Sequence, residues 1–176
     1  PNIVSVHEVG RADERIYIVS DLVDGPSLAE GLLQQRPSGQ EAAALCQKVA
    51  LALDHAHAAG VVHRDLKPAN ILVSTDAQVH LLDFGIAKLL EDGRAFETRL
   101  TQVAGRALTP EYASPEQIMG DPITTASDVY SLGVIFYELL TESRPYQLKR
   151  NSRGALEDAV IEMEPARPST RVQAPG

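Results

Sequence analysis

Cysteine is nearly absent from the sequence, since Cys46 is the only one among 176 residues. An internal disulfide and a zinc site built from several cysteines are therefore excluded, and a reducing compartment is the default expectation. Apolar runs are also short, and no window approaches the roughly 18 uninterrupted apolar residues that a membrane-spanning helix requires. We therefore expect a cytoplasmic domain without a membrane segment, and we leave open a membrane anchor elsewhere in the parent protein.

Positive charge is scarce as well. The chain has 16 Lys and Arg residues against 24 Asp and Glu residues, and its net charge is −8. A surface of that sign repels nucleic acids and anionic lipids, so we expect neither as the main partner. An apolar fraction of 44% is ordinary for a globular protein and predicts a hydrophobic core. The length suits one domain or a large part of one.

The N-terminal part of the chain has the composition of strands. Ile3–Val9 and Arg15–Val23 are rich in Val, Ile and Tyr, and a polar break separates them. This pattern predicts two antiparallel strands, the second of which ends at Asp24-Gly25-Pro26. Because the chain begins inside this pattern and closes in a Pro-rich stretch, Pro165–Gly176, we expect both ends to be cuts in a longer protein.

A long helix is predicted from Ser38 to Ala59. Ser38 and Glu41 have the spacing of a capping box, which satisfies free backbone groups at the start of a helix. Apolar residues then recur with a period near 3.6 and give the helix one apolar face. These residues are Leu45, Val49, Leu53 and Ala56. We interpret His55 and His57 as residues of the helix surface, because no set of metal ligands accompanies them.

The rest of the chain predicts more helix than strand. Ile71–Val73 and Val79–Leu82 are short apolar strands around a polar turn. Ser127–Thr141 has apolar residues on more than one face and predicts a helix buried nearly all round. Leu156–Met163 predicts a short amphipathic helix, and the polar Asp92–Pro110 a long surface loop. Strands followed mostly by helices indicate an α+β fold with a small sheet at the N-terminal edge.

Several polar residues stand where phosphoryl transfer would need them. That reaction requires a carboxylate that orients the attacking hydroxyl and accepts its proton, and cations that neutralise the phosphate. Asp65 lies in the loop before the short hairpin, and Lys67 is close enough to reach a phosphate. Asn70 and Asp83 flank the hairpin, whose two ends meet, so their oxygens can hold magnesium together. Gly85 frees the backbone for a sharp turn after Asp83.

The motifs around these residues resemble those of protein kinases. Residues 63–70, His-Arg-Asp-Leu-Lys-Pro-Ala-Asn, resemble the catalytic loop H-R-D-L-K-P-x-N, and Asp83-Phe84-Gly85 resembles the D-F-G motif. Residues 109–116 resemble the end of the activation segment, with Ser-Pro-Glu in place of A-P-E. Residues 128–133 resemble the buried helix beneath the catalytic loop, and residues 20–25 the hinge between the two lobes. The sequence Ser-Pro-Glu-Gln at residues 114–117 is typical of bacterial kinases, so the chain resembles bacterial Ser/Thr protein kinases.

The resemblance implies a kinase fold and a phosphoryl-transfer role for the catalytic positions. Asp65 would be the catalytic base, and Lys67 would steady the γ-phosphate of ATP. Asn70 and Asp83 would hold Mg²⁺. Thr109 would contact the catalytic loop and favour Ser or Thr hydroxyls of protein substrates, and Lys67 points to the same substrates.

An adenine site is implied in the hinge. The Asp21 carbonyl and the Val23 amide would pair with the base. Ser20 would be the gatekeeper, and Leu72 would lie under the adenine. ATP and Mg²⁺ are therefore the cofactors that the resemblance implies.

Arg64 suggests regulation, because an arginine beside the catalytic aspartate usually pairs with a phosphate on the activation loop. The nearest candidate acceptors are Thr98 and Thr101. In the alternative interpretation, Arg64 only braces the loop.

Other matching positions have structural roles in the family. Asp128 would brace the backbone around His63 and Arg64. His63 and Phe84 would belong to a stacked internal column, although both are also compatible with plain core packing. Glu116 would lack the downstream arginine with which it usually pairs.

Some parts of a kinase domain are missing from the sequence. It contains no glycine-rich phosphate loop and no lysine on a preceding strand, and Leu108 replaces the usual glycine before Thr109. We therefore expect residues 1–25 to be the end of the small lobe and the hinge. Residues 26–164 would be an incomplete large lobe, and residues 165–176 a truncated Pro-rich tail.

Two other functions remain open at this point. A non-catalytic, pseudokinase-like interaction module is disfavoured because the catalytic residues expected in this lobe are all present. A small-molecule kinase that shares the fold is disfavoured by Lys67 and by the docking segment Thr109–Tyr112. The leading hypothesis is an ATP-dependent Ser/Thr protein kinase whose isolated fragment has little or no activity.

Overall fold

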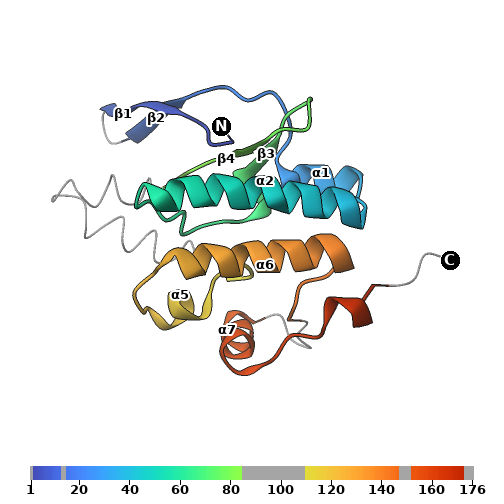
Figure 1. The fold of residues 1–176 in the computed structure, drawn as a ribbon. Helices are drawn as coiled ribbons and strands as arrows, with labels where there is room; N and C mark the ends of the chain where they lie inside the picture. Colours follow the sequence, from blue (N-terminus) through green and yellow to red (C-terminus); the bar gives the residue numbers. More distant parts are fainter. Residues whose placement is uncertain (1, 13–14, 85–109, 147–151, 173–176) are drawn as a thin grey trace.

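The computed structural model describes residues 2–12, 15–84, 110–146 and 152–172. The elements are β1 (Val6–Ala12), β2 (Arg15–Ser20), α1 (Leu28–Gln34), α2 (Gly39–Ala58), η1 (Pro68–Asn70), β3 (Ile71–Val73), β4 (Val79–Leu81), α5 (Pro115–Met119), α6 (Thr125–Thr141), α7 (Arg153–Glu162) and η2 (Pro168–Thr170). The antiparallel pairs β1–β2 and β3–β4 lie on one side of α2, and α6 packs along its other side (Figure 1). The short helices α5 and α7 lie beyond α6. This is the α+β arrangement that the order of the elements predicted.

The N-terminal hairpin differs from its predicted bounds. β1 is displaced by three residues along the chain, and β2 ends three residues early. The backbone of residues 2–4 instead pairs with β4, since Val4 N donates to Leu81 O (3.0 Å) and Leu81 N donates to Asn2 O (2.9 Å). A strand far along the sequence therefore provides the backbone hydrogen bonds of residues 2–4. The local sequence pattern could not reveal this pairing.

The predicted capping box at the start of α2 is confirmed. Ser38 N donates to the Glu41 carboxylate (2.7 Å), and Glu41 N donates to Ser38 Oγ (3.3 Å). The helix begins one residue after Ser38. Helix α1 was not predicted from the sequence, although Ser27 and Glu30 form the same reciprocal cap. The cap was readable in the sequence, but only one residue of α1, Leu28, is buried, so the apolar stripe that signals a helix is weak.

Helix α6 packs against α2 in the centre of the fold, but it is not buried nearly all round as predicted. Val129 is 63% exposed, because Asp128 beside it points inward and is 1% exposed. No residue from Val134 to Leu140 is exposed, so the prediction holds for the second half. The main buried core joins α6 to α2 and to the β3–β4 hairpin. Its largest fully buried apolar side chains are Leu66, Ile71, Leu81, Ile135, Val49 and Val79.

The β3–β4 hairpin has the predicted first strand, while β4 ends one residue earlier than predicted. The chain leaving the predicted hinge runs directly against β3, where Val73 N donates to Pro26 O (3.0 Å). A Cβ placed on Gly25 would meet Val73 O at 2.2 Å. Only glycine allows this approach, so Gly25 permits the predicted hinge to pass close over the hairpin.

The last helix, α7, begins three residues before its predicted start. Ser152 caps it by accepting a hydrogen bond from Ala155 N (3.2 Å). Of the predicted loop Asp92–Pro110, all but Pro110 falls outside the described residues. In the described part of the chain, no helix combines the length and the apolar character needed to cross a membrane.

Candidate active site

The loop between α2 and β3 exposes one carboxylate between buried neighbours. His63 and Leu66 are each only 2% exposed, whereas the Asp65 side chain is 44% exposed. The buried residues anchor the loop in the core, so Asp65 is held at the surface by its neighbours.

Two other predicted site residues, Lys67 and Asn70, contact Asp65. Lys67 Nζ donates to Asp65 Oδ2 at 2.7 Å. Asn70 Nδ2 donates to the Asp65 carbonyl at 2.8 Å and lies 3.3 Å from Asp65 Oδ2. The loop therefore folds back on itself, and Lys67 and Asn70 both contact Oδ2 of the Asp65 carboxylate.

Asn70 and Asp83 lie at adjoining ends of the hairpin, because Leu82 N donates to the Asn70 carbonyl at 2.9 Å. Since the Asn70 amide nitrogen is used by Asp65, its Oδ1 is left as an acceptor. Among the described residues, no group donates to this Oδ1 or to the Asp83 carboxylate. Asp83 adopts a left-handed backbone with φ 61°, a conformation that aspartate tolerates better than most residues. An amide and a carboxylate oxygen are suitable Mg²⁺ ligands.

Asn70 and Asp83 alone would give a metal ion only a small number of protein ligands. The described part of the chain has no cluster of three or more His, Cys, Asp or Glu side chains placed to hold a metal ion. Mg²⁺ commonly binds through one or two protein ligands together with substrate phosphates and water. The pair Asn70 and Asp83 therefore fits a metal that arrives with a nucleotide.

The Asp128 carboxylate lies beneath the loop and accepts three hydrogen bonds. Its donors are His63 N (2.8 Å), Arg64 N (2.9 Å) and His57 Nε2 (2.7 Å). The side chain is 1% exposed, and a buried carboxylate is tolerable only with such a full set of donors. Arg64 has a left-handed backbone with φ 70°, which the two backbone hydrogen bonds hold in place.

The interpretation of His57 as a helix-surface residue was wrong. Its side chain is only 15% exposed and binds Asp128, which follows 71 residues later. His57 lies in the last turn of α2, on the side that meets α6. Helical spacing alone could not show this, because the partner comes from a distant helix.

His63 and Phe84 are in contact, which fits both the stacked column that the resemblance implies and plain core packing. Their ring centroids are 4.7 Å apart at an interplanar angle of 54°. Burial lowers the pKa of His63 below its ordinary value, against opposing contributions from Asp128 and other carboxylates. Neither ring nitrogen has a hydrogen-bond partner among the described residues. The His63 ring therefore contacts the D-F-G segment through its face rather than through a hydrogen bond.

The predicted hinge residues follow β2. Asp21 N donates to Ser5 O (3.0 Å), and the Asp21 carboxylate binds His7 Nε2 (2.6 Å). This hydrogen bond from His7 lowers the pKa of Asp21. Among the described residues, nothing bonds to the Asp21 carbonyl or the Val23 amide, so both backbone groups are available to a ligand. Ser20, which ends β2, is exposed.

Leu72 lies half-buried in β3, opposite His80. An isolated bridge pairs it with Ser27, just after the hinge. The structure thus brings Leu72 beside the chain that leaves the predicted adenine site.

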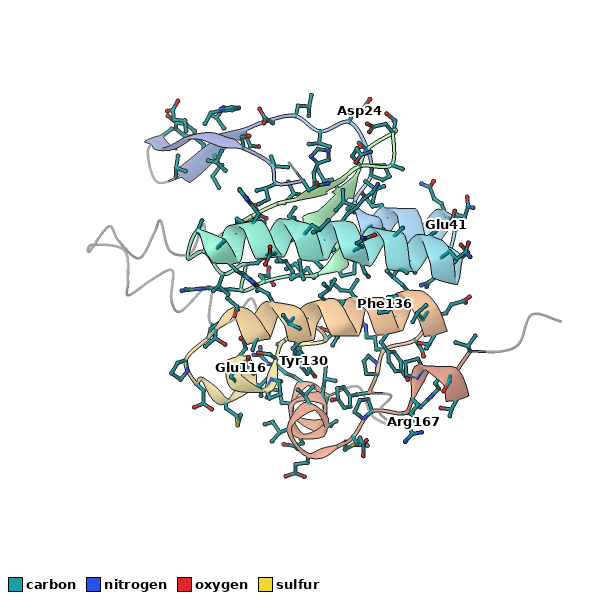
Figure 2. All side chains as sticks on the ribbon, in the orientation of Figure 1. Asp24, Glu41, Glu116, Tyr130, Phe136 and Arg167 are labelled. Atoms are coloured by element: carbon teal, nitrogen blue, oxygen red, sulfur yellow. The ribbon has the colours of Figure 1, made fainter. Side chains whose placement is uncertain are left out.

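Glu116 lies on α5, close to the start of α6 (Figure 2). Its carboxylate accepts a hydrogen bond from Ser127 Oγ. Burial acts to raise the pKa of Glu116, but the hydrogen bond from Ser127 and neighbouring groups outweigh it, and the pKa is lowered. Ser127 therefore supplies a partner within the described residues. Gly85, Thr98, Thr101, Leu108 and Thr109 lie outside the described residues.

Gln117 was not among the residues predicted from the sequence. It is 8% exposed, and its side-chain amide donates to the Arg64 carbonyl of the catalytic loop. The available signal was the spacing Ser114-x-x-Gln117, which is that of a capping box. The cap is present in α5, but the contact with Arg64 depends on the tertiary fold.

Comparisons with known proteins agree with these observations. A family model described as "Protein kinase domain" matches residues 1–172. The chain is 42% identical over 147 residues to a probable serine/threonine-protein kinase PknB of Lactococcus lactis. It is 40% identical over 148 residues to serine/threonine-protein kinase PknE of Mycobacterium tuberculosis. It is 43% identical over 176 residues to serine/threonine-protein kinase PkaA of Streptomyces coelicolor.

These matches cover most of this chain but little of the relatives. They include 83%, 84% and 97% of this chain, but only 23%, 25% and 31% of the three proteins. The chain thus spans about a quarter to a third of the length of these relatives.

Proposed function

The chain belongs to the protein kinase family, and from that premise we propose that its protein transfers the γ-phosphate of ATP to Ser or Thr hydroxyls of other proteins. The observation that carries the proposal is the cluster at Asp65. An exposed carboxylate is held between Lys67 and Asn70, with Asp83 at the adjoining end of the hairpin. This set combines a base, a cation and two metal ligands within one loop and one hairpin.

Each of these residues has a distinct task in the proposed reaction. Asp65 orients the acceptor hydroxyl and takes its proton. Lys67 moves from Asp65 to the transferred phosphate, which carries more negative charge than the carboxylate. Asn70 and Asp83 would hold Mg²⁺, which when bound neutralises charge on the phosphates.

The hinge is proposed as the adenine site. The Asp21 carbonyl would accept from the exocyclic amine of adenine, and the Val23 amide would donate to a ring nitrogen. Leu72 would contact the face of the base. Gly25 supports this geometry, because it permits the chain of the hinge to pass close to Val73 O.

The choice of Ser or Thr as acceptor is supported by the names of the relatives, all of which are described as serine/threonine-protein kinases. In this chain, Lys67 favours the same choice, and Thr109 would contact the catalytic loop. We place the domain in the cytoplasm, where ATP is supplied, and propose that protein chains are its substrates.

The proposed organisation assigns residues 1–25 to the end of the small lobe and the hinge. Residues 26–164 belong to the large lobe, and residues 165–176 form a tail. Residues 1–176 have no glycine-rich loop and no lysine on a preceding strand, and such parts normally hold the α- and β-phosphates. We therefore expect residues 1–176 alone to bind MgATP weakly and to transfer little phosphate.

The test uses the protein produced from its complete reading frame. It is incubated with MgATP labelled at the γ-phosphate and with peptides that differ only in a Ser, Thr or Tyr acceptor. We expect label on Ser and Thr peptides, a requirement for Mg²⁺, and loss of transfer in Asp65→Asn. Asp121→Asn is the matched control, because Asp121 is an exposed carboxylate outside the proposed site. Transfer by Asp65→Asn at the wild-type rate, or label on the Tyr peptide alone, would contradict the proposal.

A further inference from the structure

The side chain of Gln117 joins two segments that a kinase must align. Gln117 belongs to α5, which follows the segment expected to dock substrate. Its Oε1 accepts from Ser114 N (3.0 Å), while its Nε2 donates to the Arg64 carbonyl (2.5 Å). One buried amide group therefore caps α5 and also holds the catalytic loop.

We propose that Gln117 is a positioning residue for phosphoryl transfer, and that it fixes the peptide unit between Arg64 and Asp65 against α5. This inference rests on the proposed function. It concerns a residue that acts through the backbone of the catalytic loop, because Gln117 itself touches no reacting group.

The held peptide unit is the one that determines the orientation of Asp65. A peptide group is planar, so the Arg64 carbonyl and the Cα of Asp65 move together. The Arg64 amide is already bound by Asp128 (2.9 Å). With its carbonyl bound by Gln117, both backbone polar groups of Arg64 are fixed, and its left-handed φ of 70° has no freedom to relax.

The same region also connects to α6. Ser131 Oγ donates to the Tyr112 carbonyl (2.8 Å), which ties the docking segment to that helix. Tyr112, Gln117 and Ser131 line one small crevice together with Asp65. Gln117 thus occupies the point where the docking segment, α6 and the catalytic loop meet.

The chemistry of the contact requires glutamine. A capping box accepts either Glu or Gln at this position, because it needs only an acceptor oxygen. The contact with the Arg64 carbonyl needs a donor, and an ionised glutamate has none. Gln117→Glu therefore keeps the cap and removes the bridge, whereas Ser114→Ala removes one hydrogen bond of the cap and keeps the bridge.

The experiment measures kcat and the KM for ATP of the protein from its complete reading frame, with rates normalised to the folded fraction. We expect Gln117→Glu to lower kcat about tenfold or more, since small misplacements of catalytic groups can cost about 100-fold. The KM for ATP should stay within about twofold of wild type, because the nucleotide is held elsewhere. Ser114→Ala should lower kcat less than about threefold.

If Gln117→Glu does not fold, Gln117→Met tests the same contact, because methionine has a similar length and carries neither a charge nor a donor. Gln117→Met should show the same loss of kcat. A Gln117→Met kcat within about twofold of wild type, or an equal loss in Ser114→Ala, would overturn the inference. An inactive wild-type protein would instead refute the proposed function, so the two failures are distinguishable.

Discussion

Replacement of Asp128 by asparagine should loosen the catalytic loop while leaving its shape almost unchanged. Asp128 accepts from His57 and His63 N at Oδ2 and from Arg64 N at Oδ1. Asparagine has one acceptor oxygen, so an NH₂ group must face at least one of these donors. Asp128→Asn therefore replaces a hydrogen bond with a donor–donor contact in a site that is 1% exposed.

The cost can be worked from the hydrogen bonds that are lost. A hydrogen bond to a charged acceptor contributes about 1.5–3 kcal/mol, and an unsatisfied buried donor costs about 1–3 kcal/mol. We therefore expect Asp128→Asn to lower local stability by about 3 kcal/mol or more, a large fraction of the 5–15 kcal/mol that stabilises a typical domain. At 1.4 kcal/mol for each factor of ten, this corresponds to about 100-fold.

Amide hydrogen exchange measures this effect where it occurs. The backbone amides of His63 and Arg64 should exchange about 100-fold faster in Asp128→Asn than in wild type, because local opening controls their protection. Asp121→Asn serves as the control and should leave both rates unchanged. Exchange at His63 and Arg64 within about threefold of wild type in Asp128→Asn would show that Asp128 does not hold these two amides.

Three further predictions concern other parts of the chain. Burial raises the pKa of Cys46 to about 11, so native protein at pH 8 should react with iodoacetamide far more slowly than unfolded protein; equal rates would contradict this. Hydrogen bonds from Ser38 lower the pKa of Glu41. The stability that the Glu41 cap contributes should therefore be fully present above the pKa of Glu41 in the unfolded chain and be lost as the pH falls through its pKa in the folded protein. Acid titration of Glu41→Gln should not show this loss of stability. Phosphorylation of Thr98 or Thr101 should raise activity, and a Thr98→Ala, Thr101→Ala double variant that stays fully active would exclude it.

The elements with strong local signals were predictable from the sequence. The Ser38 capping box and the apolar stripe behind it determine α2 almost to the residue. The strand Ile71–Val73 follows from a short apolar run beside a polar turn. The residues around Asp65 come from one loop and one hairpin, so their proximity also follows from local spacing.

Features that depend on distant partners were not predictable. His57 looked like a surface residue because its partner, Asp128, lies on another helix. Gln117 could be recognised as a helix cap, but its second contact crosses to the catalytic loop. Val129 looked apolar enough for burial, yet the inward orientation of Asp128 places it on the outer side of α6.

The central claim is that Asp65 performs the proton transfer of a phosphoryl-transfer reaction. It can be tested by single-turnover transfer with saturating MgATP and enough enzyme to bind all of a Ser peptide, because the binding of both substrates is then removed from the rate. We expect Asp65→Asn to bind MgATP as wild type does and to transfer phosphate at least about 100-fold more slowly, as expected for the loss of a general base. A single-turnover rate within about tenfold of wild type would exclude Asp65 as the base.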